Sequence, residues 1–188
     1  MPEQDFLSGH FLIAMPNLGD PNFHHAVTLI CEHSSEGAMG ITINRPMEDI
    51  HLGDVLGQLE VRNPPQQIAD QPLYSGGPVE RERGFVIHRP VGSWESSIEL
   101  GADLAVTSSR DILEAMGHGQ GPTESLVALG YAGWGAGQLE QELAENAWLS
   151  SPADPAILFT TEPAHRWREA ARGMGVDLDR LSAQSGRA

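Results

Sequence analysis

The chain begins with short apolar runs of the length typical of strands rather than helices. "HFLIAM" (10–15) predicts a buried strand. "AVTLICEH" (26–33) and "GAMGITINRP" (37–46) are rich in β-forming residues, and the polar stretch "SSEG" (34–37) connects them. Because a short polar connection that ends in glycine commonly joins two paired strands, we expect these two runs to form a hairpin.

Helical spacing first occurs in "HLGDVLGQL" (51–59), where four apolar residues fall on one face. We expect "VRNPPQQIADQP" (61–72) to be a loop, because paired prolines interrupt regular structure. A second helix is predicted at 109–117, with Ser108 as its N-cap and Asp111 as the acid of a capping-box variant.

The rest of the chain continues with short strands and a few helices. The other predicted strands are 73–77, 83–90, 96–101, 104–109, 125–133 and 156–159, and the other predicted helices are about 138–145 and 164–175. The final "SAQSGRA" (182–188) is expected to be frayed. Strands outnumber helices and hairpins dominate the first half, so the pattern predicts a mixed sheet with helices packed on it, of α+β class.

Length and charge narrow the classes of function. The 188 residues predict one domain over 1–188, with a frayed tail from about 180. The formal net charge is −15 and every positive side chain is an arginine, which excludes a P-loop lysine, a Schiff-base lysine and a Ser–Lys dyad. Direct nucleic-acid binding is also unfavourable for so acidic a chain. Two local arginine groups are expected to be ordinary surface residues: Arg81 and Arg83, and Arg166, Arg168 and Arg172.

Cysteine usage and hydropathy give the expected compartment. Cys31 is the only cysteine, so neither an intrachain disulfide nor a cysteine-rich zinc site can form. No apolar run approaches the roughly 20 residues that cross a bilayer. The first residues, "MPEQDFLSGHFLIAMP", carry acids where a signal peptide has basic residues. We therefore expect a cytoplasmic protein that does not associate with a membrane.

The glycines of "GYAGWGAGQLEQEL" (130–143) raise the question of a phosphate-binding loop. They fit neither the dinucleotide fingerprint nor the P-loop pattern. Trp134 stands where a pyrophosphate requires bare backbone, and Glu140 and Glu142 would repel an anion. A tight strand-to-helix turn is the favoured interpretation, with Gly137 as N-cap and Glu140 reaching back to it.

Two further side-chain arrangements are compatible with either a structural role or a role in binding or catalysis. Gln138 and Glu142 are four residues apart and share a helix face, which is typical of a solvated surface and less often of a polar cleft beneath Trp134. Cys31 and His33 would point to the same side of a regular strand, as a nucleophile and its base would. A buried, inert cysteine is the favoured interpretation. The histidine spacings do not fit a metal site, and no metal or cofactor is predicted.

Four long stretches stand in order along nearly the whole chain: "SGHFLIAMPNLGDPNFHHAVTLICEHSSEGAMGITINRP" (8–46), "YSGGPVERERGFVIH" (74–88), "TSSRDIL" (107–113) and "GYAGWGAGQLEQELAENAWL" (130–149). Together they resemble the YqgE/AlgH family of bacterial proteins. Many members end in Gly-His-Ala, whereas this chain ends in Gly186, Arg187 and Ala188.

The resemblance implies a fold more definitely than a function. It implies a strongly bent, branched sheet that forms a pseudo-barrel with helices outside. The family's biochemical activity is not established. One member's name comes from a proposed role in transcriptional regulation of alginate synthesis, and family genes often lie beside a gene for a Holliday-junction resolvase-like protein.

The matching stretches supply the candidate site. Its members are Glu32, His33, Asn44, Arg45, Pro46, Gly76, Gly77, Pro78, Trp134, Gln138, Glu140 and Glu142. We expect a pocket formed by the 44–46 turn, the 76–78 turn and the helix start at 138. Because no complete catalytic constellation is present, the first hypothesis is a non-catalytic binding or regulatory protein with a protein or small-molecule partner. The alternatives are an enzyme that uses Glu140 or Glu142 with His33 or Arg45, and direct DNA binding.

Overall fold

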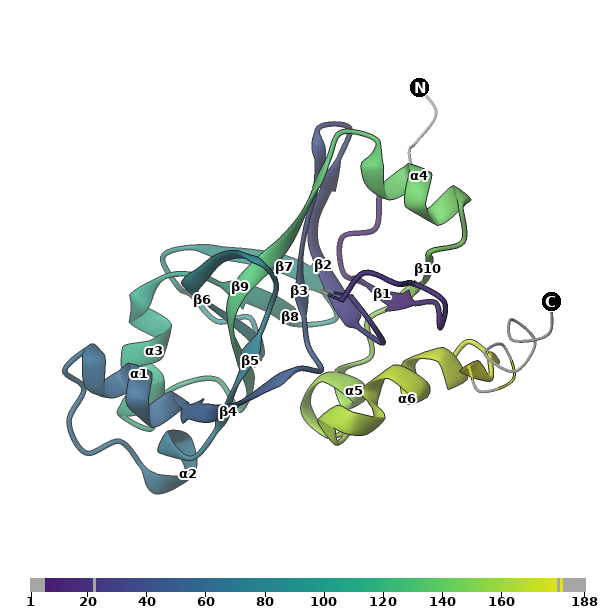
Figure 1. Ribbon diagram of the computed structural model, residues 1–188. Coiled ribbons are helices and arrows are strands. Elements are labelled where there is room, and N and C mark those ends of the chain that lie inside the picture. Colours follow the sequence, from purple (N-terminus) through teal and green to yellow (C-terminus); the bar gives the residue numbers. More distant parts are fainter. Residues whose placement is uncertain (1–5, 22, 179, 181–188) are drawn as a thin grey trace.

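The computed structural model describes residues 6–21, 23–178 and 180 (Figure 1). The strands are β1 (His10–Ala14), β2 (Val27–Ser34), β3 (Gly37–Thr42), β4 (Pro46–His51), β5 (Pro72–Ser75), β6 (Val79–Arg89), β7 (Ser97–Gly101), β8 (Leu104–Thr107), β9 (Glu124–Gly135) and β10 (Trp148–Pro152). Within the described residues they form one strongly curled sheet in the order β10-β1-β2-β3-β9-β6-β8-β7, from which β4 and β5 branch. The predicted α+β class is confirmed.

The curl brings the two ends of the sheet together. A Cβ on Gly9, just before β1, would lie 2.6 Å from the carbonyl oxygen of Leu100 in β7. The sheet therefore nearly closes on itself, as the resemblance implies.

Helices cover the outside of the sheet in three groups (Figure 1). They are α1 (Leu52–Gln58), α2 (Gln66–Ala69), α3 (Arg110–Gly117), α4 (Gln138–Ala144), α5 (Pro155–Phe159) and α6 (Arg166–Arg172), with a 3₁₀ turn at Pro163–His165. The first three helices pack together at one end of the molecule, whereas α4 contacts β3, β9 and β10. α5 contacts β9, and α6 contacts β1 and β2.

Both faces of the central strands are buried, which explains their continuous apolar runs. Ile13 in β1 belongs to a core cluster that strands from both ends of the sheet share with residues of α5 and α6. Its neighbour Leu12 points to the opposite face and packs with Trp134 and Leu139 near α4. A third cluster packs α1 and α3 against β6 and β9 through Leu56, Ile112 and other apolar residues.

The sheet branches because β9 changes its neighbour along its length. Residues Leu73–Ser75 of β5 pair in parallel with Val127–Leu129, near the start of β9. Farther along, Gly37–Gly40 of β3 pair with Ala132–Gly135 on β9. The strand β6 pairs with β9 from Glu124 to Leu129 and again at Tyr131. β5 and β3 therefore pair with different parts of β9, β5 near its start and β3 near its end. We call the place where these two strands diverge, near the middle of β9, the fork.

The structure corrects several predicted elements. The run 156–159 is the helix α5 rather than a strand, because Pro155 occupies its first turn and the Asp154 carboxylate accepts the Ala156 N–H at 2.9 Å. The strand that pairs with β1 is β10 instead. The N-cap of α3 is Ser109 and not Ser108.

Two further elements differ from the sequence prediction, and others agree with it. The predicted loop at 61–72 contains the short helix α2, and β4 occupies a region where no strand was predicted beyond Pro46. The hairpin of β2 and β3 is confirmed. The terminal "SAQSGRA", including Gly186, Arg187 and Ala188, lies outside the described residues.

Candidate functional site

The twelve candidate residues fall into three separate places. Five lie around α4: His33, Trp134, Gln138, Glu140 and Glu142. Six lie at the fork: Asn44, Arg45, Pro46, Gly76, Gly77 and Pro78. Glu32 lies apart from both groups, beside a cavity between β2 and β6. The structure therefore brings together the 44–46 and 76–78 turns, whereas the helix start at 138 does not line the same cavity.

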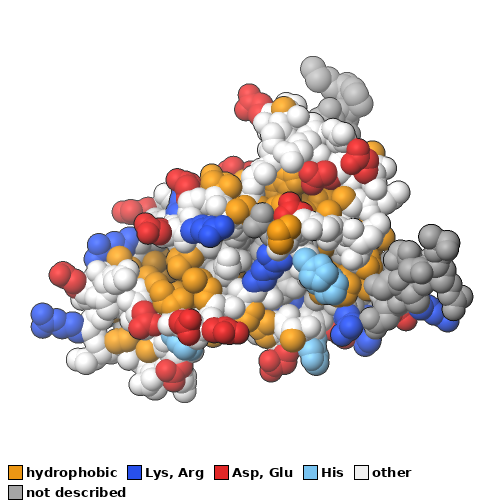
Figure 2. Space-filling view, viewed as in Figure 1, with side chains coloured by type: hydrophobic (Ala, Val, Ile, Leu, Met, Phe, Trp, Pro, Cys, Tyr) orange, Lys and Arg blue, Asp and Glu red, His pale blue; other side chains and the backbone are white. Residues whose placement is uncertain are grey.

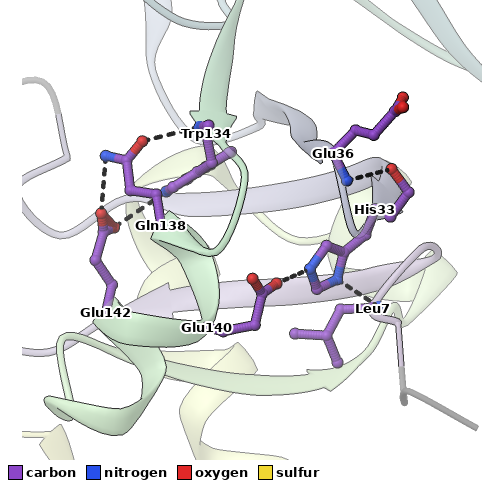
Figure 3. A network of polar contacts seen from close by, with 9 residues as sticks. Leu7, His33, Glu36, Trp134, Gln138, Glu140 and Glu142 are labelled. Carbon is purple, nitrogen blue, oxygen red and sulfur yellow. Dashed lines mark hydrogen bonds and ion pairs between the residues drawn. The ribbon is translucent and has the colours of Figure 1, made fainter.

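The carboxylate of Glu142 holds α4 on the sheet (Figure 3). Its Oε1 accepts the indole N–H of Trp134 at 3.0 Å and that of Trp148 at 2.9 Å, and its Oε2 accepts the Gln138 side-chain amide at 3.2 Å. Both tryptophans are buried and pack against the ring of Phe23. Since a buried indole N–H needs an acceptor, Glu142 satisfies two donors that would otherwise be unpaired.

A second polar contact joins α4 to β2. His33 Nδ1 accepts the backbone N–H of Leu7 at 3.0 Å, and His33 Nε2 is hydrogen-bonded to Glu140 Oε1 (Figure 3). Because Nδ1 accepts, it carries no proton, so Nε2 carries the proton and donates it to Glu140. The His33 side chain is only 3 % exposed, which leaves the imidazole occupied at both nitrogens and almost covered. We call the residues joined by these hydrogen bonds the α4 contact: Leu7, His33, Trp134, Gln138, Glu140, Glu142 and Trp148.

The glycine-rich stretch before α4 is a structural turn. Gly137 is the N-cap of α4 with φ of 74°, as predicted from the sequence. The helix has no side-chain cap, and the Gln138 Oε1 instead accepts the N–H of Gly135, which precedes the helix, at 3.0 Å. Glu140 is directed to His33 instead of reaching back to Gly137. The Gly135 N–H of the glycine-rich stretch is thus already paired within the protein.

Cys31 and His33 point to opposite faces, so the same-side expectation was wrong. A bulge in β2 sets Ile30 opposite Gly40 and Glu32 opposite Met39, which adds one residue to β2 and reverses the alternation. Cys31 packs in the core with Ile41 and is fully buried. Burial strongly raises the pKa of its thiol, so Cys31 remains protonated and inert.

At the fork, main-chain hydrogen bonds hold the two turns against β9. The Thr42 N–H donates to the Gly76 carbonyl at 2.8 Å, the Ser75 N–H donates to the Arg45 carbonyl at 2.9 Å, and the Gly76 N–H donates to Leu129 at 2.8 Å. These bonds continue the pairing where β3 leaves β9 and β5 replaces it. The fork is therefore a rigid junction of backbone rather than a loose loop.

Two glycines allow this close approach. Gly77 has φ of 155°, and a Cβ there would overlap the main chain of Tyr131. Gly130 has φ of 83°, and a Cβ there would lie 2.6 Å from the Gly77 carbonyl oxygen. The glycines of "SGGP" and "GYAG" consequently fit each other across the fork.

Side chains of the 44–46 turn fix it to the preceding segment. Asn44 accepts the Val27 N–H at 3.0 Å and donates to the His25 carbonyl at 2.9 Å. Arg45 donates to the His24 carbonyl at 2.9 Å. Pro46 pairs with Tyr74 across β4 and β5. Asn44 therefore has a structural role, whereas Arg45 is held in place and also lines a cavity.

This cavity, which we call the fork cavity, encloses about 250 Å³. It is lined by Thr42, Arg45, Met47, Ser75, Gly77, Pro78, Arg81 and Leu129. Burial lowers the pKa of Arg45, and the nearby Asp20 carboxylate opposes that shift. Figure 2 shows arginine side chains near the centre of this face, in the region of β3, β5 and β6, with acidic side chains around them. One arginine of the 44–46 turn and one of β6 thus line the same hollow of an acidic protein.

Sequence reasoning found part of this lining and missed the rest. Arg81 is exposed, as the sequence predicts, and it also lines the cavity, whereas Thr42, Met47 and Leu129 have no motif that marks them as lining residues. Nothing in local spacing connects these residues, since they come from four different strands. Ser75 precedes Gly76 in "YSGGP", so its position beside a turn was the one available signal.

Two negative findings apply to the described part of the chain. Residues 6–21, 23–178 and 180 contain no group of three or more histidine, cysteine, aspartate and glutamate side chains placed to hold a metal ion. Within the same ranges, no helix has both the length and the apolarity needed to cross a membrane.

The fold and this geometry define a class of α+β proteins with a curled, branched sheet and a polar cavity at its fork. The chain belongs to the AlgH-like family, whose model matches residues 11–179, and this confirms the resemblance seen in the sequence.

Relatives and solved structures agree over almost the full length. A UPF0301 protein of Hahella chejuensis is 56 % identical over 97 % of this chain and 96 % of its own, and one of Nitrosococcus oceani is 53 % identical over 97 % of each. The solution structure of the AlgH protein from Pseudomonas aeruginosa has a TM-score of 0.79 at 50 % identity, covering 100 % of this chain and 99 % of that one. A Corynebacterium diphtheriae protein shares the fold at 23 % identity, with a TM-score of 0.74 and coverage of 97 % and 94 %.

Proposed function

We propose that this protein is a non-catalytic binding protein that holds a small oxyanion-bearing ligand in the fork cavity. The observation that carries the proposal is the convergence of Arg45 and Arg81 on one cavity in a chain of net charge −15. An anion is repelled by most of such a surface, so a site with two guanidinium groups is where it can be held.

The geometry of the two arginines suits an oxyanion. The bond from Arg45 to the His24 carbonyl orients its side chain before any ligand arrives, which lowers the entropic cost of binding. Arg81 makes no ion pair or side-chain hydrogen bond within the described residues, so its donors are available. The planar guanidinium matches carboxylate and phosphate oxygens, and the hydroxyls of Thr42 and Ser75 add further donors.

The size and location of the cavity also favour a small ligand. Its volume of about 250 Å³ is just below the roughly 300–1,000 Å³ of typical ligand sites. It lies at the fork, where β3 and β5 separate beside β9. A phosphate or a short dicarboxylate fits these limits better than a dinucleotide.

The geometry supports the two alternative functions, an acid/base enzyme and a DNA-binding protein, less well. His33 and Glu140 do converge, as an acid/base enzyme requires, but the contact occupies both imidazole nitrogens. Glu142 is bonded to tryptophan side chains, and Arg45 lies at the fork cavity rather than beside His33. A regulatory role would act through a protein partner rather than DNA, given the acidic charge. A gel shift at low and moderate salt tests this point, and salt-sensitive DNA binding would contradict it.

Calorimetric titration with phosphate, sulfate, malonate and citrate tests the proposal. We expect at least one anion to bind with submillimolar affinity. Replacing Arg45 or Arg81 with glutamine should weaken that binding about tenfold or more, because a charge-assisted hydrogen bond contributes about 1.5–3 kcal/mol.

The matched control is Arg62→Gln, which removes the same charge from an exposed position outside the cavity. It should leave the affinity nearly unchanged. If no anion binds, or if Arg62→Gln weakens binding as much as Arg81→Gln, the fork cavity is not the anion site.

A further inference from the structure

A second cavity lies between β2 and β6, away from the fork. It encloses about 430 Å³, which is within the range of small-molecule sites. Its lining residues are Glu32, Ala38, Met39, Arg83, Phe85, Ile98, Ser108, Tyr131 and Gly133. None of them lines the fork cavity, so the two sites do not share a contact surface.

The floor of this β2–β6 cavity is apolar and aromatic. Phe85 and Tyr131 meet edge to face with ring centroids 5.9 Å apart. Met39 packs on the same core cluster as Phe85. An apolar side chain of a ligand would therefore find aromatic rings and a methionine, which adapt well to varied shapes.

Opposite charges stand at the two sides of this floor. Arg83 lies over the Phe85 ring, with its guanidinium carbon 5.2 Å from the ring centroid, and its only ion pair within the described residues is an exposed 3.3 Å contact with Glu80. The side chain of Glu32 makes no hydrogen bond or ion pair in the described part of the chain, and the residue is exposed. Each charge can accept a ligand partner, since an arginine has more donors than one carboxylate uses.

The separation of the charges sets the length of the ligand. Glu32 is on β2 and Arg83 on β6, with β3 and β9 between them. Three strand spacings of about 4.8 Å give about 14 Å across a flat sheet, and less across a curled one. The two residues are also offset along β9, because Met39, opposite Glu32, pairs with Gly133, whereas Gly84, next to Arg83, pairs with Leu129. A single amino acid, whose two charges adjoin one carbon, is too short to reach both residues. Two to four extended residues, at about 3.4 Å each, cover the gap left between the two side chains.

We propose that the β2–β6 cavity binds a short apolar peptide with free ends, its amino group on Glu32 and its carboxylate on Arg83. The hydroxyls of Ser108 and Tyr131 lie in the same cavity and can pair with the peptide backbone. The site is independent of the fork cavity and its ligand.

Blocking the ends of the peptide one at a time tests the proposal. The probes are the tripeptide Ala-Leu-Ala, its N-acetylated form and its C-terminal amide, titrated by calorimetry. Acetylation should weaken binding to the wild-type protein about tenfold, yet should have no further effect on Glu32→Gln. Amidation should weaken binding to the wild-type protein similarly, yet should have no further effect on Arg83→Gln.

Two controls separate this site from the fork and from general charge effects. Glu36→Gln removes a nearby exposed carboxylate from the β2–β3 turn and should not alter peptide affinity. Arg81→Gln should weaken anion binding at the fork but leave peptide binding unchanged, so the two proposals can fail separately. Absence of saturable binding at millimolar tripeptide would overturn the inference. The inference would also be overturned if acetylation of the peptide weakened binding to Glu32→Gln as much as it weakens binding to the wild-type protein.

Discussion

At the α4 contact, Glu142 accepts three hydrogen bonds from side chains of the protein itself. At the fork, Arg81 faces a cavity and makes no ion pair within the described residues. Both places lie in stretches that mark the family in the sequence, and both contain charged residues near tight glycine turns. They differ in what the charged side chains face: Glu142 is bonded to other side chains of the protein, whereas Arg81 faces a cavity.

This difference separates residues that specify the fold from residues that are available to a ligand. A charged group whose hydrogen bonds are completed internally stabilises the structure, and its removal leaves buried partners unpaired. A charged group directed into a hollow contributes little to folding and can be used for recognition. Family signatures alone do not distinguish the two cases, because both constrain the residue type.

The largest expected effect comes from removing Glu142. Glu142→Ala leaves the indole N–H groups of Trp134 and Trp148 without their acceptor. Since each unpaired buried donor costs about 1–3 kcal/mol, the free energy of unfolding should fall by about 3 kcal/mol. Urea unfolding followed by tryptophan fluorescence measures this change directly.

Glu142→Gln is the matched control for that variant. Its remaining carbonyl oxygen can still accept both indoles, while its amide group opposes that of Gln138. The loss should be about 1 kcal/mol. Equal losses for the two variants would contradict the role of Glu142 as an indole acceptor.

The fork should be sensitive to backbone crowding rather than to charge. Gly77→Ala places a Cβ against the main chain of Tyr131 at a positive φ, and neither the turn nor β9 can move without breaking the junction. Overpacking of this kind costs about 1–3 kcal/mol, so we expect a loss of about 2 kcal/mol in urea unfolding.

Gly57→Ala provides the contrast within the same protein. Gly57 lies in α1, and a Cβ there meets nothing within 4 Å. Alanine favours the helix by about 0.5–1 kcal/mol over glycine, so this variant should be neutral or slightly more stable. If Gly57→Ala lowered the free energy of unfolding and Gly77→Ala did not, steric crowding at the fork would be contradicted.

The sequence predicted the fold class and most strands because their signals are local. The apolar run at 10–15 and the polar turn at 34–37 each specify an element without distant contacts. The error at 156–159 has the same origin, since four apolar residues fit a strand or a helix equally well and Pro155 decides between them. The bulge at Cys31 depends on how β3 pairs with β2, which spacing within one strand does not reveal.

The candidate site was less predictable because its residues are far apart in sequence. The motif positions proposed one pocket, whereas the structure divides them among the α4 contact, the fork and the β2–β6 cavity. The division depends on which strand replaces β3 beside β9, a property of the topology rather than of any motif. Arg81 illustrates this well, since it becomes a cavity residue only when β6 and β4 lie around the same fork.

The smallest expected effect on stability is that of Arg81→Gln. This side chain is exposed and has no partner within the described residues, so no internal hydrogen bond is lost when the charge is removed. Surface changes of this kind stay within about 0.5 kcal/mol, and urea unfolding should place the variant beside the wild type. Glu142→Ala should show the reverse pattern, with a large loss of stability and, under conditions where it remains folded, unchanged anion affinity. If Arg81→Gln instead unfolds as readily as Glu142→Ala, the arginine supports the junction itself, and the distinction between a structural contact and a ligand site fails at the fork.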